Sequence, residues 1–387
     1  GAAPMTQVPV TLSGRAGEKP WKTSATTDEH GMFSVGAPTG LHGNVHVGVQ
    51  LGQTRIERDV DAGDLTLRLT SPSTLEPSVS LSGAWKFATD PPQDFSRPGF
   101  DDSSWASIDV PAHWVIKGFK SRDGVGGYRR HVQIPEAWSG RRIKLRFDGV
   151  YSGAEVWFNG QRMGSHEGGF TPFEIDVTDL AKSGDNLLAV RVTEHTRSSS
   201  LDNMSLYADF ELSGIIRDVT VFAVPATHVE RMHVATHFDA DYRNATLKID
   251  VKLVNESNRR VPRGELRWEL RSPEGTAVPA PFLPLRFSLP PWGHLEKTIE
   301  IPVEKPQHWE AEHPRLYHLS ARLTEGGKET EQVARRIGFR QVEIRGTQLL
   351  INGVPVKLRG TCHHDSDPVR GRAVTPELTR QDLQLIK

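Results

Sequence analysis

Apolar and polar residues alternate along most of the chain up to about residue 340, which is the pattern of strands with one buried face. In ATLKIDVKLVN every second position is apolar, and RRIKLRFDGV repeats the pattern. The runs NLLAVRV, HLSARL and DLTLRL are similar, and Gly, Pro, Asn or Asp separates them. We therefore predict a mainly β protein built from sandwiches. In ATLKIDVKLVN the predicted buried face consists of Ala245, Leu247, Ile249, Val251 and Leu253, and in RRIKLRFDGV it consists of Ile143, Leu145 and Phe147.

Two Asn-Gly pairs mark tight hairpins. Asn159-Gly160 and Asn352-Gly353 each lie between apolar residues, and both central positions of a type I′ turn need the positive φ that Asn and Gly tolerate. Each pair predicts two antiparallel strands joined by two residues.

A helix is predicted only after Thr375. Thr375 is a good N-cap, Pro376 suits the first helical position, and Glu377 favours the positive end of the helix dipole. Leu378, Leu383, Leu385 and Ile386 then share one arc of the helix, which must be buried against a partner. The strand VPVKLRG before it completes a strand–loop–helix unit, so we predict that a β/α domain begins here.

Shifts in composition divide the chain into four parts, and 387 residues exceed what one hydrophobic core usually serves. The first part ends at LTSPST, and the second holds most of the tryptophans and ends at VFAVP. The third is a regular strand set. The predicted parts are residues 1–74, 75–225, 226–338 and 339–387.

Charge and apolar content exclude several classes of protein. The formal net charge of −1 gives no reason to expect nucleic acid or an anionic membrane as a partner. No apolar run approaches the roughly 20 residues that span a bilayer, so we expect a soluble protein. Cys362 is the single cysteine, which excludes an internal disulfide framework and a cysteine-based zinc cluster. The start GAAPMTQ lacks the basic and apolar regions of a signal peptide. We expect that a signal was removed or that the sequence begins downstream of one. We favour a secreted or periplasmic location over a cytoplasmic one.

The loop CHHDSD is the first candidate for chemistry, because it follows a strand directly. It offers His363, His364, Asp365 and Asp367. In a β/α barrel the active site lies at the carboxyl ends of the strands, where imidazoles can donate hydrogen bonds to substrate hydroxyls or coordinate a cation. The alternative is a polar loop whose aspartates cap local backbone groups. Zinc is disfavoured because no second His/Cys pair lies at ligand spacing.

Two other stretches have a structural and a functional interpretation. The segment LYADFELSGIIRDV, residues 206–219, is either a loop that reaches outside its own domain or a surface connection with Arg217 and Asp218 in an ion pair. Five tryptophans are either a sugar-stacking platform or the core of a sandwich, and the core is the more usual place. They are Trp85, Trp105, Trp114, Trp138 and Trp157.

Several ordered motifs together resemble glycoside hydrolase family 2, the β-galactosidase/β-glucuronidase family. LSGAWKFATD, DDSSWASIDVPAHW, GVYSGAEVWFNGQRMGSHEGGFTPFEIDVT and LSGIIRDVTVF resemble its N-terminal jelly-roll sugar-binding domain. IGFRQVEI followed by NGVPVKLRGTCHHDSDPVRGRAVTPE resembles the passage from its immunoglobulin-like domain into its catalytic (β/α)₈ barrel. The resemblance covers about residues 75 to 387 and implies a jelly roll, an immunoglobulin-like sandwich and the first β/α unit of a truncated TIM barrel.

The resemblance implies a retaining exo-β-glycosidase, most similar to β-galactosidases, that cleaves terminal β-glycosidic bonds with two glutamates. Such a pair of carboxyl groups lies about 5–5.5 Å apart. Both glutamates belong deeper in the barrel, so we expect no catalytic residue in this chain and no hydrolysis by it alone. The expected substrate is a β-glycoside derived from an oligosaccharide or polysaccharide, and a homo-oligomer is left open.

Three residues receive binding roles from the resemblance. In the β-galactosidase branch the loop after the first barrel strand reads R-G-x-N-x-H and its histidine contacts the sugar; here that position is His364, with Asp365 beside it. Cys362 replaces the Asn of the motif. An aspartate before S-G-I-x-R touches the sugar and an alkali cation, and Asp209 lies nearby, although ADFELSG is not in step with that pattern. The cofactor of the intact enzyme is left open, with Mg or Na as the candidates, and no metal site is assigned here.

Residues 1–74 fall outside this resemblance. Their turn TTDEHGMFSV resembles small carboxypeptidase-regulatory-like sandwich modules, which accompany extracellular carbohydrate-active enzymes. Alternative functions are a β-glucuronidase-like or other β-glycosidase of the same family, a non-catalytic carbohydrate-binding or adhesive protein of several sandwiches, and a fragment that assembles with a separate barrel half.

Overall fold

The computed structural model describes residues 9–16, 19–26, 44–51, 54–61, 77–202 and 212–387. The chain divides into two compact units, Gly1–Leu75 and Glu76–Lys387. In this described part of the chain, no helix is long and apolar enough to cross a membrane.

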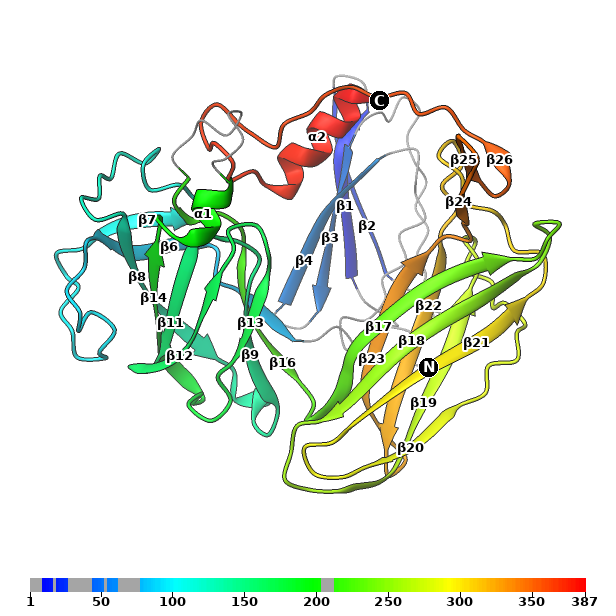
Figure 1. Ribbon diagram of the computed structural model, residues 1–387, viewed down its shortest axis with the longest axis horizontal. Coiled ribbons are helices and arrows are strands. Elements are labelled where there is room, and N and C mark those ends of the chain that lie inside the picture. The colour runs from blue at the N-terminus through cyan, green and yellow to red at the C-terminus, as the bar shows by residue number, and fades with distance from the viewer. Residues whose placement is uncertain (1–8, 17–18, 27–43, 52–53, 62–76, 203–211) are drawn as a thin grey trace. The chain divides into compact units, whose positions relative to one another are not determined.

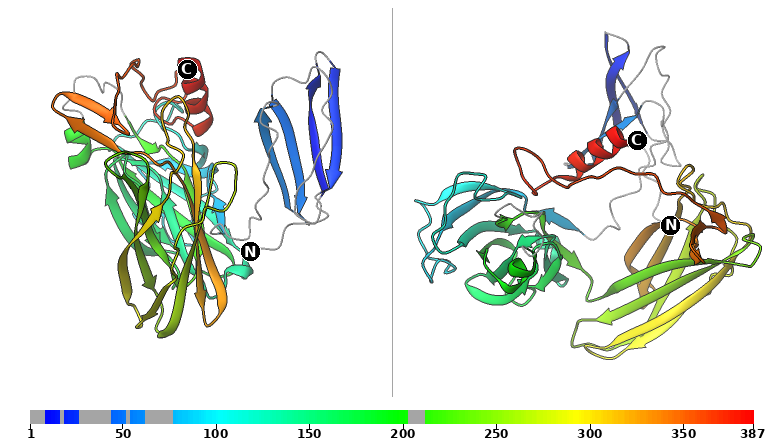
Figure 2. Two further views of the ribbon diagram at one scale, coloured as in Figure 1. Left: turned by 90° about the vertical axis from the view of Figure 1, so that its right-hand side faces the viewer. Right: turned by 45° about the horizontal axis from the view of Figure 1, so that its top comes forward.

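The first unit contains one antiparallel sheet with the strand order β2-β1-β3-β4, drawn in blue in Figure 2. Leu12 on β1 is buried. The turn expected in TTDEHGMFSV lies outside the described residues after Thr26, and the second sheet of a sandwich stays a prediction. The strands are β1 Pro9–Ala16, β2 Lys19–Thr26, β3 Asn44–Leu51 and β4 Thr54–Asp61.

The second unit begins with a two-sheet sandwich (Figure 1). A six-stranded sheet, β12-β11-β14-β8-β6-β7, packs against a four-stranded sheet, β13-β9-β16-β5, around one hydrophobic core. The pair β10-β15 and the short helices η2 and α1 complete it. The elements are β5 Ser78–Ser80, β6 Gly83–Thr89, β7 Ala106–Val110, β8 Val125–Ile134, η2 Glu136–Trp138, β9 Arg142–Phe147, β10 Val150–Tyr151, β11 Gly153–Phe158, β12 Gln161–Glu167, β13 Phe173–Asp176, β14 Gly184–Thr193, α1 Arg197–Asp202, β15 Gly214–Ile215 and β16 Val219–Val224.

The ends of this first sandwich meet in its four-stranded sheet. Ser80 of β5 pairs with Thr220 of β16, and β16 also pairs along its length with β9. The Leu81 N–H donates to the Val219 carbonyl at 2.7 Å. The sheet is therefore complete only when its first and last strands are together.

A second sandwich follows after two residues. Its sheets are β17-β18-β21 and β20-β19-β22-β23, and they enclose a separate core. In β18 the predicted alternation is observed, because Ala245, Leu247, Ile249, Val251 and Leu253 are all buried. The strands are β17 Thr227–Phe238, β18 Ala245–Asn255, β19 Val261–Arg271, β20 Leu285–Leu289, β21 His294–Val303, β22 Tyr317–Glu325 and β23 Lys328–Ile337.

The last part is a small sheet followed by a helix. Strands β24 Val342–Arg345, β25 Gln348–Ile351 and β26 Val354–Pro355 pair in order, and α2 spans Pro376–Ile386. Thr375 caps α2 as predicted, because its side chain accepts a hydrogen bond from the Leu378 N–H at 3.3 Å. Leu383, Leu385 and Ile386 are 58%, 78% and 47% exposed, so in the described residues the apolar arc has no cover.

Both predicted hairpins are confirmed. Asn159 and Gly160 have φ values of +50° and +84° and join β11 to β12, and Asn352 and Gly353 have φ values of +50° and +76° and join β25 to β26. The short helices η2 and α1 were not predicted, since both lie well before Thr375.

Three of these tryptophans belong to the core of the first sandwich. Trp85, Trp114 and Trp138 are buried, whereas Trp105 and Trp157 are half-buried against Phe95, with ring centroids 6.0 and 5.6 Å apart. The core interpretation is therefore correct for Trp85, Trp114 and Trp138, whereas for the half-buried Trp105 and Trp157 it stays a prediction.

Candidate functional site

The loop between β26 and α2 holds the His/Asp-rich segment in an ordered arrangement. Nε2 of His363 lies 3.1 Å from Oδ2 of Asp382 on α2, and Nδ1 lies 3.6 Å from Oδ1 of Asp365. The imidazole thus stands between two carboxylates and links the loop to the helix.

Asp367 has a structural role. Its Oδ1 accepts hydrogen bonds from the backbone N–H groups of Val369 and Arg370 at 2.9 and 2.8 Å. Its own N–H donates to the Gly371 carbonyl at 2.9 Å, and the Gly371 N–H donates back at 2.8 Å. For this residue, the prediction of an aspartate that caps local backbone is confirmed.

His364 and Asp365 remain available for a ligand. Both are exposed, and within the described residues the imidazole of His364 makes no hydrogen bond or ion pair. Asp365 is 63% exposed at its side chain and lies 3.6 Å from Nδ1 of His363. The binding roles of these two residues stay predictions.

The end of the same loop is attached to the first sandwich. Ala373 is 1% exposed and packs with Tyr151, Leu212 and Ile216 in a small cluster. The Arg217 guanidinium donates hydrogen bonds to the carbonyls of Ile216 and Arg372. Residues 212–216 are buried, and within the described residues no salt bridge joins Arg217 to Asp218. For this part of the stretch 206–219 the predicted surface connection with that ion pair is therefore wrong, and residues 212–217 hold the loop instead.

Gly371 is required at this contact. Its φ is +60°, and a Cβ at this position would lie 2.5 Å from Cδ1 of Ile116 and 3.1 Å from Cδ2 of His113. A side chain here would be strained by its backbone and would also push the loop away from the sandwich.

Burial shapes the electrostatics of this contact. Burial lowers the pKa of Arg217, and the neighbouring Arg372 adds to this effect, whereas Asp365 and Asp218 oppose it. Asp218 itself accepts a hydrogen bond from the Ser82 hydroxyl at 2.9 Å. Asp365 is thus close enough to Arg217 to stabilise its charge, which links the predicted ligand loop to the sandwich.

The contact makes a testable prediction. In Arg217→Met the Arg372 carbonyl loses its donor, and we expect the amides of Gly371 and Ala373 to exchange about tenfold faster, as the loss of one hydrogen bond to a charged group implies. Hydrogen exchange followed by mass spectrometry measures this. Arg370→Met in the same exposed stretch is the matched control and should leave the exchange rates unchanged. Equal rates in both variants would show that Arg217 does not hold the loop.

The predicted cation contact falls elsewhere. Asp209 lies outside the described residues, so its role stays a prediction. Within the described ranges, no group of three or more His, Cys, Asp or Glu side chains could hold a metal ion.

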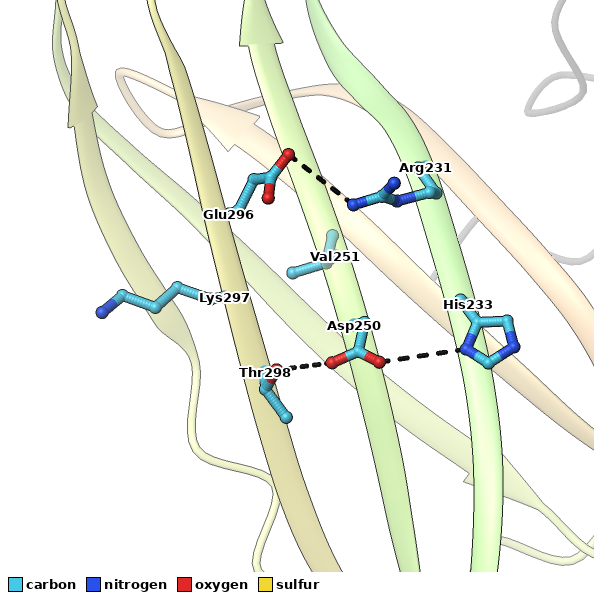
Figure 3. Close-up of a pocket in the computed structure, with 7 residues that line it drawn as sticks. All are labelled: Arg231, His233, Asp250, Val251, Glu296, Lys297 and Thr298. Atoms are coloured by element: carbon cyan, nitrogen blue, oxygen red, sulfur yellow. Dashed lines mark hydrogen bonds and ion pairs between the residues drawn. The ribbon is translucent and has the colours of Figure 1, made fainter.

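Charged residues also line a hollow of about 500 Å³ on the outer face of β17, β18 and β21 (Figure 3). Arg231 lies 3.6 Å from Glu296, and His233 lies 3.9 Å from Asp250. Thr298 donates a further hydrogen bond to Asp250. Because these side chains satisfy one another, the hollow is a solvated sheet face rather than a site with unpaired groups.

Comparison with known proteins agrees with the order of these parts. Residues 84–225 match the sugar binding domain of glycosyl hydrolases family 2, residues 227–340 match the next domain of that family, and residues 342–387 match its TIM barrel domain. The chain belongs to glycoside hydrolase family 2.

Curated relatives in the family include β-galactosidases. That of Halalkalibacterium halodurans is 30% identical over 338 residues, and that of Priestia megaterium is 29% identical over 339 residues. Each alignment covers 80% of this chain but 32% of the relative. The chain therefore spans about a third of the length of these curated family 2 proteins.

Solved family 2 structures have the same fold. A β-glucuronidase of Bacteroides uniformis matches with a TM-score of 0.72 and 29% identity, over 80% of this chain and 38% of that chain. A family 2 member from Bacteroides cellulosilyticus matches with a TM-score of 0.69 and 26% identity, over 80% of this chain and 42% of that chain. The mainly β architecture predicted from the sequence is thereby confirmed.

The sequence analysis did not identify three features of this family 2 chain. His113 is buried beside Gly371, Arg217 contacts the loop rather than forming only a local pair, and Trp292 is exposed on the second sandwich. Only Trp292 has a local signal, because the PPWG sequence places an aromatic residue in a tight turn. The other two depend on contacts between residues distant in the chain.

Proposed function

We propose that this chain is the front portion of a retaining exo-β-glycosidase of the β-galactosidase type. The observation that carries the proposal is the unbroken order of three family 2 domains, the last of which is the TIM barrel. Active sites of such barrels lie on the loops after the strands, and we assign the His/Asp-rich loop, near the start of the barrel match, to that position. Relatives that act as β-galactosidases support the substrate class.

His364 and Asp365 bind the sugar in this proposal. Imidazole and carboxylate groups on the first barrel loop can exchange hydrogen bonds with sugar hydroxyls, and His363 is occupied by Asp382. Hydrolysis itself requires two carboxyl groups at a defined separation, one as acid/base and one as nucleophile. We place both beyond these residues, because residues 342–387 are a small part of a barrel that typically has about 250 residues.

A β-glucuronide is the second candidate substrate. The solved structures of Bacteroides uniformis at 29% identity are β-glucuronidases, so fold and overall similarity do not separate the two sugars. The two differ in charge, since a glucuronide carries a carboxylate that a galactoside lacks. A non-catalytic, multi-sandwich carbohydrate-binding protein is the remaining alternative.

The test measures hydrolysis of chromogenic β-galactoside and β-glucuronide by two samples: this 387-residue chain and the full product of its reading frame, each checked by intact mass. We expect a product heavier than 43.0 kDa to hydrolyse the galactoside with release of the β-anomer, and the chain alone to be inactive. A preference for the glucuronide would mean that the substrate is a β-glucuronide and not a β-galactoside. Turnover by the chain alone, or none by the full product, would overturn the proposal.

His364 gives the corresponding mutational prediction. In the full product, His364→Ala should lower kcat/KM for the galactoside roughly 10- to 100-fold, the usual effect of losing one hydrogen bond to a substrate. His237→Ala, which removes an exposed histidine from β17, is the control and should have no effect. Unchanged kinetics in His364→Ala would exclude the assigned contact.

A further inference from the structure

Trp292 is presented to solvent on a rigid turn. The residue is 63% exposed and has a φ of +55°, a conformation that a bulky side chain seldom adopts. The turn is held by hydrogen bonds from the Trp292 N–H to the Ser257 carbonyl at 3.1 Å and from the Gly293 N–H to the Pro290 carbonyl at 3.1 Å. The buried Asn255 side chain donates to the same Pro290 carbonyl at 2.9 Å. Backbone strain that the surroundings maintain in this way is typical of functional sites.

The indole ring is also oriented before any ligand arrives. The Arg142 guanidinium lies 5.6 Å from the ring centroid, within the range of a cation–π contact. Arg142 is in turn fixed by two hydrogen bonds to Asp176, at 3.1 and 2.8 Å. The position of the ring is therefore set by a chain of contacts from the first sandwich.

The ring borders a groove of about 450 Å³ where the two sandwiches meet. Hydroxyl, amide, ammonium, guanidinium and carboxylate groups line it, and together they offer both donors and acceptors of hydrogen bonds. The carboxylate of Glu256 in the groove is neutralised by Lys144 at 2.9 Å. The groove thus combines one aromatic face with polar groups and has no strong charge of one sign; its polar lining includes Ser139, Thr178, Lys182, Ser183 and Asn258.

We propose that this groove is a second carbohydrate-binding site, which takes one or two units of a neutral oligosaccharide against Trp292. The apolar face of a pyranose ring packs on an exposed indole, while its hydroxyls need a mixed set of donors and acceptors nearby. The choice of a sugar rests on the proposed function. The groove shares no residue with the His364 loop, so it would hold a part of the glycan away from the bond that is cut.

Two other occupants fit less well. A proline-rich peptide is usually recognised in grooves lined by several aromatic side chains, and here one exposed indole is present beside the buried Trp138. A nucleic acid would require a basic surface, but the formal net charge of the protein is −1.

The experiment titrates the 387-residue chain with β-1,4-galactotetraose and follows the indole N–H signals of its nine tryptophans by NMR. We expect the Trp292 signal, assigned from Trp292→Phe, to shift with a Kd on the order of 1 mM, as suits one aromatic contact. Trp292→Ala should weaken binding at least tenfold, and Asn258→Ala, on the polar side of the groove, severalfold. Trp309→Phe is the matched control, because Trp309 also carries an arginine, Arg340 at 4.7 Å, but does not line the groove.

The proposal would be overturned if the Trp292 signal does not move at tens of millimolar sugar, or if Trp292→Ala binds as the parent does. Trp292-dependent dimerisation in sedimentation, or equal binding of a proline-rich peptide, would assign the groove to another partner and also refute it. The measurement involves no turnover. Its failure would leave the hydrolysis test of the proposed function unaffected, and the converse also holds.

Discussion

Replacement of Arg129 by Met should destabilise the first sandwich by about 3–5 kcal/mol, the usual cost of removing one partner from a buried ion pair. Arg129 on β8 is 2% exposed, and its Nε donates to Asp102 at 2.6 Å. The same guanidinium donates to the carbonyls of Phe95, Arg97 and Phe100. Methionine fills a similar volume but leaves a carboxylate and three carbonyls without their donor.

Urea unfolding, monitored by hydrogen exchange in peptides from residues 84–224, measures the stability of this sandwich separately from that of the next one. Arg129→Lys should give an intermediate loss, because an ammonium group cannot reach all four acceptors. Arg162→Met is the matched control, since its pair with Glu155 at 2.9 Å is 52% and 38% exposed and should contribute at most about 1 kcal/mol. A loss in Arg129→Met as small as in the control would contradict the assigned role.

Acid should destabilise the chain through two buried histidines. Burial lowers the pKa of His113 to about 4, and the charges of Arg217 and Arg372 act in the same direction. Burial also lowers the pKa of His228 to about 4, with Lys144 as the next cause. Their side chains are neutral in the folded protein at neutral pH.

The sign follows from the unfolded chain, in which a histidine has its ordinary pKa of about 6.5. As the pH falls from about 6.5 to about 4, the unfolded state takes up a proton that the folded state does not, so stability falls in that window by about 3 kcal/mol for each histidine. Above about pH 6.5 the full stability is present. Urea unfolding near pH 7 and near pH 4.5 measures the difference in the free energy of unfolding between the two pH values. In His113→Gln the share of this difference that comes from the first sandwich should disappear. An unchanged difference in that variant would show that His113 is not responsible.

The strands could be predicted because their signals are local. The alternation in β18, the Asn-Gly hairpins and the Thr375 cap each depend on residues close in sequence, and the structure contains all of them. The tryptophan core followed from the apolar surface of those side chains. The helix α1 was missed because its six residues, RSSSLD, lack an apolar stripe.

The candidate site was only partly predictable. His364 and Asp365 were predicted to follow the strand VPVKLRG directly, but strand β26 is only Val354–Pro355 and residues 356–360 form no strand. The pairing of His363 with Asp382 could not be predicted, because it required the helix to fold back on the loop. Arg217 donates a hydrogen bond to the Arg372 carbonyl, and the two residues are 155 positions apart in the sequence. A contact between such distant residues cannot be predicted from a local sequence pattern. Trp292 lies between these cases, because its turn was visible but its exposure depends on how the two sandwiches meet.

The pairing of β5 with β16 has a consequence for synthesis of the protein. Ser80 and Thr220 are separated by about 140 residues, which a ribosome adds over on the order of 10 s. Strand β9 leaves the ribosome long before β16, so one of its edges waits unpaired during that interval. Folding of the first sandwich can therefore finish only after Val224 has left the ribosome, and until then the nascent chain exposes an unpaired strand edge to chaperones and to aggregation.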